Sequence, residues 1–180
     1  MSQLDAIDRQ LLQLLQTNDQ ASLGELGKAV GLVPSSVKER IKRLTEQGVI
    51  TGFHARVAPD TVGLDLLAFM FVGWGDSETE APFLKRMMRE PAVLECHHVT
   101  GAWNYLMKVR LRNTGQLERF LADVIKTVPG VQRTETLIVL SSAKETTMLT
   151  VDPPGSPVAK PTAGPTRKRR SGPRRQSRTP

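Results

Sequence analysis

The sequence has very little cysteine and no long apolar run, and these two shortages exclude several classes of protein. Cys96 is the single cysteine of the 180 residues, which excludes an internal disulfide and a cysteine-based zinc site. The longest apolar run, residues 66–73, is far shorter than the roughly 20 residues that span a bilayer. The first residues also lack the basic and apolar regions of a signal peptide, so we expect a cytoplasmic protein with no membrane partner.

The body of the chain lacks net charge, although the whole sequence has a formal net charge of +7. Residues 152–180 hold eight lysines and arginines and a single acid, Asp152, so the entire excess lies there. The other 151 residues hold 17 basic and 17 acidic side chains. Overall basicity is therefore no evidence that the body binds nucleic acid, and such evidence must come from local patterning.

The same C-terminal residues are rich in proline and contain almost no apolar side chains. Such a composition cannot bury enough surface to offset the entropy lost on folding, and it predicts a disordered tail. Two uses of the tail stay open. Its arginines could hold the DNA phosphate backbone without sequence preference, as in an architectural, nucleoid-compacting protein, or the tail could be a solubilising extension.

Amphipathic helical patterns fill the first 48 residues. The first pattern follows Asp5, a suitable N-cap, and its apolar positions have helical spacing: Ile7, Leu11, Leu14 and Leu15. In the second, Ser22 and Glu25 have the spacing of a capping box, and Gly31 is suited to end the helix. The apolar face of this second helix consists of Leu23, Leu26 and Val30.

A third helix is predicted to begin at Pro34, whose missing N–H is not needed at the first helical position, and to end at Gly48. Its apolar stripe consists of Val37, Ile41 and Leu44. Only residues 31–33 separate it from the second helix, which is the spacing of a helix-turn-helix whose second helix enters the DNA major groove. The opposite side is polar and basic and comprises Ser35, Ser36, Lys38, Glu39, Arg40, Lys42 and Arg43.

This outward side of the third helix is the candidate DNA-binding surface. Ser35, Ser36 and Glu39 lie near the helix start, where base edges are usually read. Lys38, Lys42 and Arg43 are better placed for phosphates, which position a protein without reading sequence. The alternative interpretation is a solvated helix in a three-helix bundle. The capping box, the glycine turn and the basic outward side favour DNA binding.

The second half of the chain alternates between strand and helix patterns. A strand or wing is expected over 49–58, ending before Pro59, and a buried strand over 66–73. A helix over 81–89 precedes strands over 93–99 and 105–112. A further amphipathic helix, capped by Thr114, precedes a β-branched strand over 134–140. From residue 61 onward the order β-α-β-β-α-β is that of a ferredoxin-like domain, which makes the chain an α+β protein.

Eight segments, in this order and spacing, resemble the Lrp/AsnC (feast/famine) family of transcriptional regulators: residues 4–12, 30–32, 37–44, 48–50, 99–101, 104–106, 129–131 and 134–140. The resemblance implies a winged helix-turn-helix domain with its linker strand in 1–60 and a ferredoxin-like effector-binding and oligomerisation domain in 61–150, followed by the tail in 151–180. It implies a sequence-specific regulator that binds double-stranded DNA at the nucleoid. It also implies dimers that pair through their sheets and assemble further into tetramers or octamers.

Family members bind a small effector, usually an amino acid, between their α/β domains. By the resemblance, the effector site comprises Thr100, Gly101, Asn104, Tyr105, Thr134 and Thr136. Glycine permits close backbone approach, and amides and hydroxyls suit the carboxylate and ammonium of a zwitterion. The alternative is an ordinary tight hairpin in which glycine makes the turn and asparagine satisfies it.

Two positions depart from the family pattern. Val33 stands where a polar N-cap is usual, and a missing cap typically costs about 1 kcal/mol. In the loop over 101–105, where members often have acidic residues, Asn104 replaces a common aspartate and Trp103 adds bulk, so a bulkier or less polar effector is expected, or none.

An enzyme on the same fold is the remaining alternative, because tetrapyrrole (sirohaem) decarboxylases resemble these regulators and use histidine. His97 and His98 are adjacent, so on a strand they point to opposite faces and cannot jointly hold a metal. Neither a nucleophile–base pair nor a phosphate-binding glycine loop is found. We therefore expect a regulator rather than an enzyme, with no catalytic residue, no metal and no cofactor other than the effector.

Overall fold

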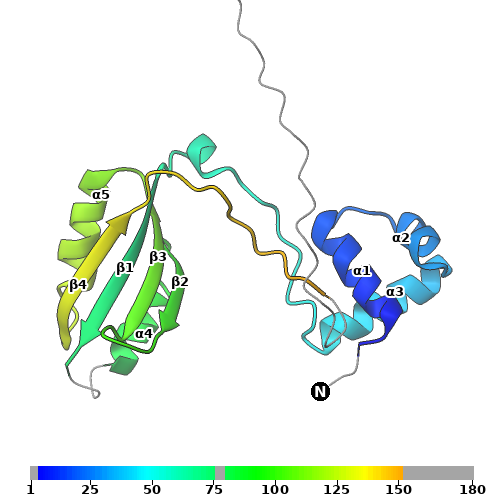
Figure 1. Cartoon of the computed structure of the whole chain (residues 1–180), viewed down its shortest axis with the longest axis horizontal. Helices are drawn as coiled ribbons and strands as arrows, with labels where there is room; N and C mark the ends of the chain where they lie inside the picture. Colours follow the sequence, from blue (N-terminus) through cyan, green and yellow to red (C-terminus); the bar gives the residue numbers. More distant parts are fainter. Residues whose placement is uncertain (1–3, 76–79, 152–180) are drawn as a thin grey trace, which may run out of the picture. The chain divides into compact units, whose positions relative to one another are not determined.

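The computed structural model describes residues 4–75 and 80–151, and the chain forms two compact units. One unit holds the described residues up to Phe53 together with 148–151, and the other holds His54–Thr147. The tail that the sequence predicts to be disordered, residues 152–180, lies outside the described ranges. Figure 1 shows helices alone in the first unit and a sheet with helices in the second.

Three helices build the first unit: α1 (Ala6–Thr17), α2 (Leu23–Val30) and α3 (Pro34–Glu46). The predicted caps are confirmed. Asp5 and Asp8 form a capping box on α1, and Ser22 and Glu25 form one on α2. The helices enclose a core in which the predicted apolar stripes meet: Leu11, Leu15, Leu26, Val37, Leu44 and Ile50.

The α2–α3 turn depends on two glycines. Gly31 has a φ of 70°, a left-handed conformation that glycine adopts without steric cost. Gly27 lies against the turn, and its carbonyl accepts a 2.9 Å hydrogen bond from the Leu32 N–H. A Cβ at Gly27 would lie 2.5 Å from the Leu32 carbonyl oxygen, so no larger residue fits there without a shift of the turn backbone.

The strand expected over 49–58 does not form in this structure. The amides of Val49 and Ile50 bond to the Leu44 carbonyl and close the end of α3, and residues 51–58 are exposed without regular structure. A strand requires a partner whose ladder satisfies its amides, and in the described part of the chain no ladder includes these residues. A short 3-10 helix, η1 (Pro59–Val62), follows.

The second unit has the predicted β-α-β-β-α-β order. Its elements are β1 (Leu66–Trp74), α4 (Glu80–Met87), β2 (Val93–His98), β3 (Tyr105–Leu111), α5 (Thr114–Arg119) and β4 (Val131–Ile138). The strands form one antiparallel sheet in the order β2-β3-β1-β4. Asn113, rather than Thr114, caps α5, and α5 continues as a π-helical segment, η3 (Phe120–Ile125).

The two faces of the sheet differ. Alternate residues of β1 and β3 pack with Phe83 and Phe120 of the helical layer, so one face is covered by helices and forms the core (Figure 1). The other face, here called the open face, includes Phe69, Phe71, Leu106 and Leu137, which share it because directly paired residues point the same way.

A segment beyond β4 is fastened to this open face. The Glu145 carboxylate forms ion pairs with two residues of β3, Lys108 at 2.6 Å and Arg110 at 2.9 Å. The Glu145 carbonyl accepts a hydrogen bond from Arg56. The hydrogen bond from Lys108 is the main reason that the pKa of Glu145 lies below its usual range.

Candidate DNA-binding surface and effector site

The start of α3 lacks a side-chain cap, as the sequence predicted. Val33 occupies the N-cap position without a side-chain hydrogen bond, and Pro34 occupies the first turn. Val37 and Leu44 are fully buried, which turns the opposite side of the helix outward. Ser35, Lys38 and Glu39 are exposed on that side, so polar and basic groups are available where a major groove would lie.

Arg40 and Arg43, which the sequence analysis placed on the DNA-binding side of α3, form ion pairs with carboxylates of α1 and its N-cap. The Arg40 guanidinium bonds to Asp5 at 2.6 Å and to Asp8 at 2.8 Å, and Arg43 bonds to both carboxylate oxygens of Asp8 at 2.7 Å. Asp8 is 2% exposed, and it is the only charged or polar residue classed as buried in the described ranges. The hydrogen bond from Arg40 also holds the pKa of Asp5 below its usual range.

Arg40 and Arg43 thus fix α3 against α1, a role that the sequence analysis did not assign to them, and their contact with DNA stays a prediction. The sequence contained a signal for this. Asp5 and Asp8 are three residues apart on one helix, Arg40 and Arg43 are three apart on another, and such pairs share a helix face. Lys42 lies 3.8 Å from Glu46, and both side chains are well exposed.

The sequence-predicted effector residues fall into two groups. Thr100 and Gly101 are exposed at the turn between β2 and β3, and Gly101 has a φ of 110°. Thr134 and Thr136 are half-buried on β4, where they pair with Val72 and Met70 of the core-facing side. These four residues stay a prediction, and they are not among the residues that line the hollows beside Phe120 and beside Leu26.

Asn104 and Tyr105 are already engaged within the fold. The Asn104 side-chain oxygen accepts a 2.7 Å hydrogen bond from the Trp74 N–H, and the Tyr105 hydroxyl donates to Glu80. Tyr105 is 2% exposed and packs against Phe83 and His98. Burial, with the hydrogen bond to Glu80, raises the pKa of Tyr105 far above its usual value. These contacts tie Asn104 and Tyr105 to β1 and α4, and their role as effector ligands stays a prediction.

Sequence reasoning missed Arg133. Its guanidinium lies 4.4 Å from the ring centroid of Trp103 and donates to the Ala102 carbonyl, so it holds the loop from β4. Gly73 makes room for it, because a Cβ there would lie 2.6 Å from the Arg133 Cγ. The residues lie about 30 to 60 positions apart, and no local pattern links them.

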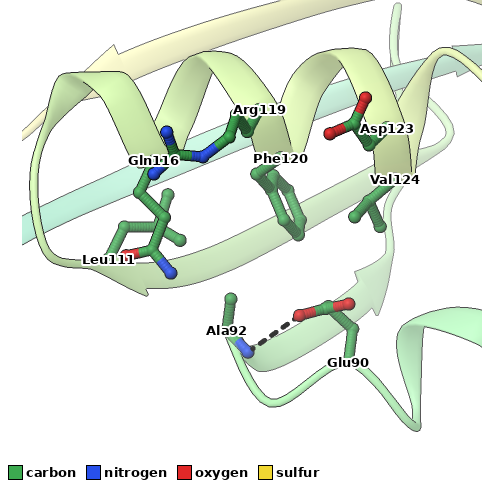
Figure 2. A pocket seen from close by; sticks show the side chains of 8 residues that line it. All are labelled: Glu90, Ala92, Leu111, Gln116, Arg119, Phe120, Asp123 and Val124. Carbon is green, nitrogen blue, oxygen red and sulfur yellow. Dashed lines mark hydrogen bonds between the residues drawn. The ribbon is translucent and has the colours of Figure 1, made fainter.

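A hollow of about 270 Å³ lies between the η3 and α5 helix and the chain that leads into β2 (Figure 2). Phe120 and Val124 line its apolar side, and Glu90 lies across from them next to Ala92. The Gln116 side-chain oxygen accepts a 2.7 Å hydrogen bond from the Arg112 N–H, which leaves its NH2 group available as a donor. The hollow is open to solvent and is lined by both apolar and polar side chains.

Comparison with known proteins agrees with this architecture. A helix-turn-helix unit followed by an α/β unit defines a DNA-binding regulator with a ligand-binding domain, and two family models match the corresponding residues. A winged helix-turn-helix DNA-binding family matches residues 4–51, and the Lrp/AsnC ligand binding domain matches residues 68–149.

The HTH-type transcriptional regulator FL11 of Pyrococcus abyssi is 38% identical over 148 residues, which are 82% of this chain and 97% of FL11. The leucine-responsive regulatory protein of Haemophilus influenzae is 34% identical over 148 residues, covering 81% and 89% of the two chains. The complex of regulator NMB0573 with L-Met from Neisseria meningitidis has a TM-score of 0.78 at 31% identity and covers 82% of this chain and 96% of that one.

The chain belongs to the Lrp/AsnC family, which confirms the resemblance read from the sequence. It is a DNA-binding transcriptional regulator and not an enzyme, and the decarboxylase and architectural alternatives are not favoured by relatives that are named as regulators. In the described ranges no helix is both long and apolar enough to cross a membrane.

The Asp8 contacts generate a stability prediction. Asp8→Asn removes the buried charge that receives Arg40 and Arg43, and we expect a loss of about 1–3 kcal/mol in the free energy of unfolding, because hydrogen bonds to charged groups are involved. Asp5→Asn is the matched control: Asp5 is half-exposed and asparagine still caps a helix, so its loss should stay below about 1 kcal/mol. Urea unfolding followed by circular dichroism measures both, and equal small losses would refute the role of Asp8.

Proposed function

We propose that this regulator reads its operator with the exposed start of α3 and that an α-amino acid changes this binding. The observation that supports the first part is the outward placement of Ser35, Ser36, Lys38 and Glu39 opposite the buried Val37 and Leu44. Hydroxyl and carboxylate groups can bond to base edges, whereas the lysine ammonium suits a phosphate. The site of action is then the nucleoid, in the cytoplasm.

Two single changes on α3 should separate base reading from phosphate binding. Ser36→Ala should reduce affinity for the operator by about 1–3 kcal/mol and relax base preference at one position. Lys38→Ala should weaken binding to operator and random duplexes to a similar degree and should reduce the log–log salt slope of the affinity by about 1. The operator is first selected from a random duplex pool, and affinities come from fluorescence anisotropy. If both variants bind the selected operator like the wild type, α3 does not read it.

An amino-acid effector is supported by the chemistry around the sheet and by one relative, whose solved structure is a complex with L-Met. The turn at Thr100 and Gly101 exposes a hydroxyl and backbone amides, which suit a carboxylate. The hollow near α5 presents the NH2 group of Gln116 and the carboxylate of Glu90 on either side of Phe120, which suits a zwitterion with an apolar side chain. The wall of Trp103 beside Arg133 favours a bulky or weakly polar amino acid.

A thermal-shift screen of the twenty amino acids tests this proposal. We expect at least one to raise Tm, because a ligand that binds only the folded state stabilises it, and the same amino acid should alter operator affinity. Thr100→Ala and Glu90→Gln then place the ligand, since only the variant at the occupied site should lose the shift. If no amino acid changes either Tm or operator binding, the effector is not an amino acid.

We also propose that two copies pair through the open face of the sheet, with further assembly into tetramers or octamers. The face carries Phe69, Phe71 and Leu106, and its edge strand adds Leu137, which is 48% exposed. Apolar side chains gathered on an exposed sheet face are typical of an interaction surface, and a two-fold dimer places one such face against itself.

Leu137→Arg should convert the dimer to a monomer, because it places a charge without a partner in the proposed contact. Leu140→Arg is the control, since Leu140 is 96% exposed and lies beyond the end of β4. Light scattering after gel filtration gives the mass of each and the size of the wild-type assembly. A monomeric wild type, or an unchanged mass for Leu137→Arg, contradicts pairing through this face.

A further inference from the structure

The last described residues return to the DNA-binding unit. The side-chain NH2 of Gln16 on α1 donates to the Leu149 carbonyl at 3.0 Å, and the Leu149 N–H donates to the Gln16 side-chain oxygen at 2.7 Å. These paired bonds, here called the Gln16–Leu149 clasp, lie within one compact unit. They hold Leu149, two residues before the last described residue, Val151, against α1 in the unit that carries α3.

Helix α3 has few cations that are not already near a carboxylate. Of the four basic side chains of α3, Arg40 and Arg43 are paired with Asp8, and Lys42 lies near Glu46. Lys38 is the one for which no ion pair is formed within the described residues. Because phosphate contacts supply most sequence-independent affinity, α3 alone gives a weak electrostatic hold on DNA.

The excess positive charge of the sequence follows the clasp along the chain. Residues 152–180 hold eight lysines and arginines against one acid, and six of the eight are arginines within 167–178. Guanidinium groups bind phosphate oxygens in a bidentate manner and keep their charge at any physiological pH. The Lrp/AsnC domain match ends at residue 149, so this basic segment is an addition to the part of the chain that the family model covers.

We propose that residues 152–180 bind the DNA phosphate backbone as a second, sequence-independent contact, and that the Gln16–Leu149 clasp holds the start of this segment beside the helix-turn-helix unit. The reach is sufficient. Sixteen peptide units join Val151 to Arg167, a covalent span of up to about 55 Å, which exceeds the width of a duplex. Because the arginines of this segment are tethered to the unit that carries α3, their local concentration is high at a duplex that α3 has bound.

The main test uses the full chain and a duplex of random sequence. In the comparison variant all eight lysines and arginines of residues 152–180 become glutamine, which keeps the length and removes the charge. We expect this variant to bind random DNA roughly tenfold or more weakly at low salt, and its log–log salt slope to fall by about 3 or more per chain. Operator selectivity, the ratio of operator to random affinity, should not decrease.

The clasp is tested separately. Gln16→Ala keeps the charged segment but releases its start from α1, so affinity for random DNA should drop by about 3–10-fold while the salt slope stays near the wild-type value. Gln13→Ala is the matched control, because Gln13 is an exposed glutamine of the same helix and the two hydrogen bonds of the clasp are formed by Gln16. It should bind DNA like the wild type.

The proposal is overturned if the glutamine variant binds random DNA with the same affinity and the same log–log salt slope as the wild type. Binding of the wild type to anionic lipid vesicles through this segment, with DNA binding unaffected, would overturn it as well. If Gln16→Ala matches Gln13→Ala, the clasp does not position the segment. Because these measurements need no operator and no effector, they succeed or fail independently of the function proposed above.

Discussion

A buried carboxylate determines how the DNA-binding unit presents its surface. Asp8 is almost fully removed from water, and a buried charge is tolerated only when it is paired and hydrogen-bonded. The two arginines that satisfy it lie on the same side of α3, so the pairing fixes the rotation of α3 about its axis as well as its distance from α1. This constraint matters because the start of α3 has no side-chain cap to hold it. The outward position of Ser35 and Lys38 follows from the inward position of Arg40 and Arg43.

The ligand-binding unit is organised around its central strand. Because β1 pairs with β3 on one side and β4 on the other, residues of β1 set both the helix-covered core and the open face. At the end of β1, Gly73 leaves room for the Arg133 side chain and the Trp74 N–H donates to Asn104. The β2–β3 turn is therefore held by contacts from β1 and from β4. A turn fixed in this way is preorganised, and a ligand that binds there does not have to order it.

Most of the fold was predictable because helix caps and apolar periodicity are local signals. Asp5, Ser22 and Gly31 lie where the sequence placed them, and the β-α-β-β-α-β order is confirmed. The strand expected over 49–58 failed because strand formation depends on a distant partner, and residue types alone do not provide one. Arg40, Asn104 and Tyr105 were assigned by residue type and position in the family pattern. Their actual partners lie about 25 to 35 residues away, and only the folded chain brings them together.

The balance of charges explains why one chain separates its positive groups into two classes. Several cations inside the folded units serve the fold: Arg40 and Arg43 neutralise Asp8, and Lys108 and Arg110 hold Glu145. A cation used in this way gains little from a phosphate, since it would have to break an existing pair. A neutral body can therefore read bases without binding every duplex strongly. By the proposal above, the charge that attracts DNA at a distance lies in residues 152–180, and its contribution depends strongly on salt, whereas that of base contacts does not.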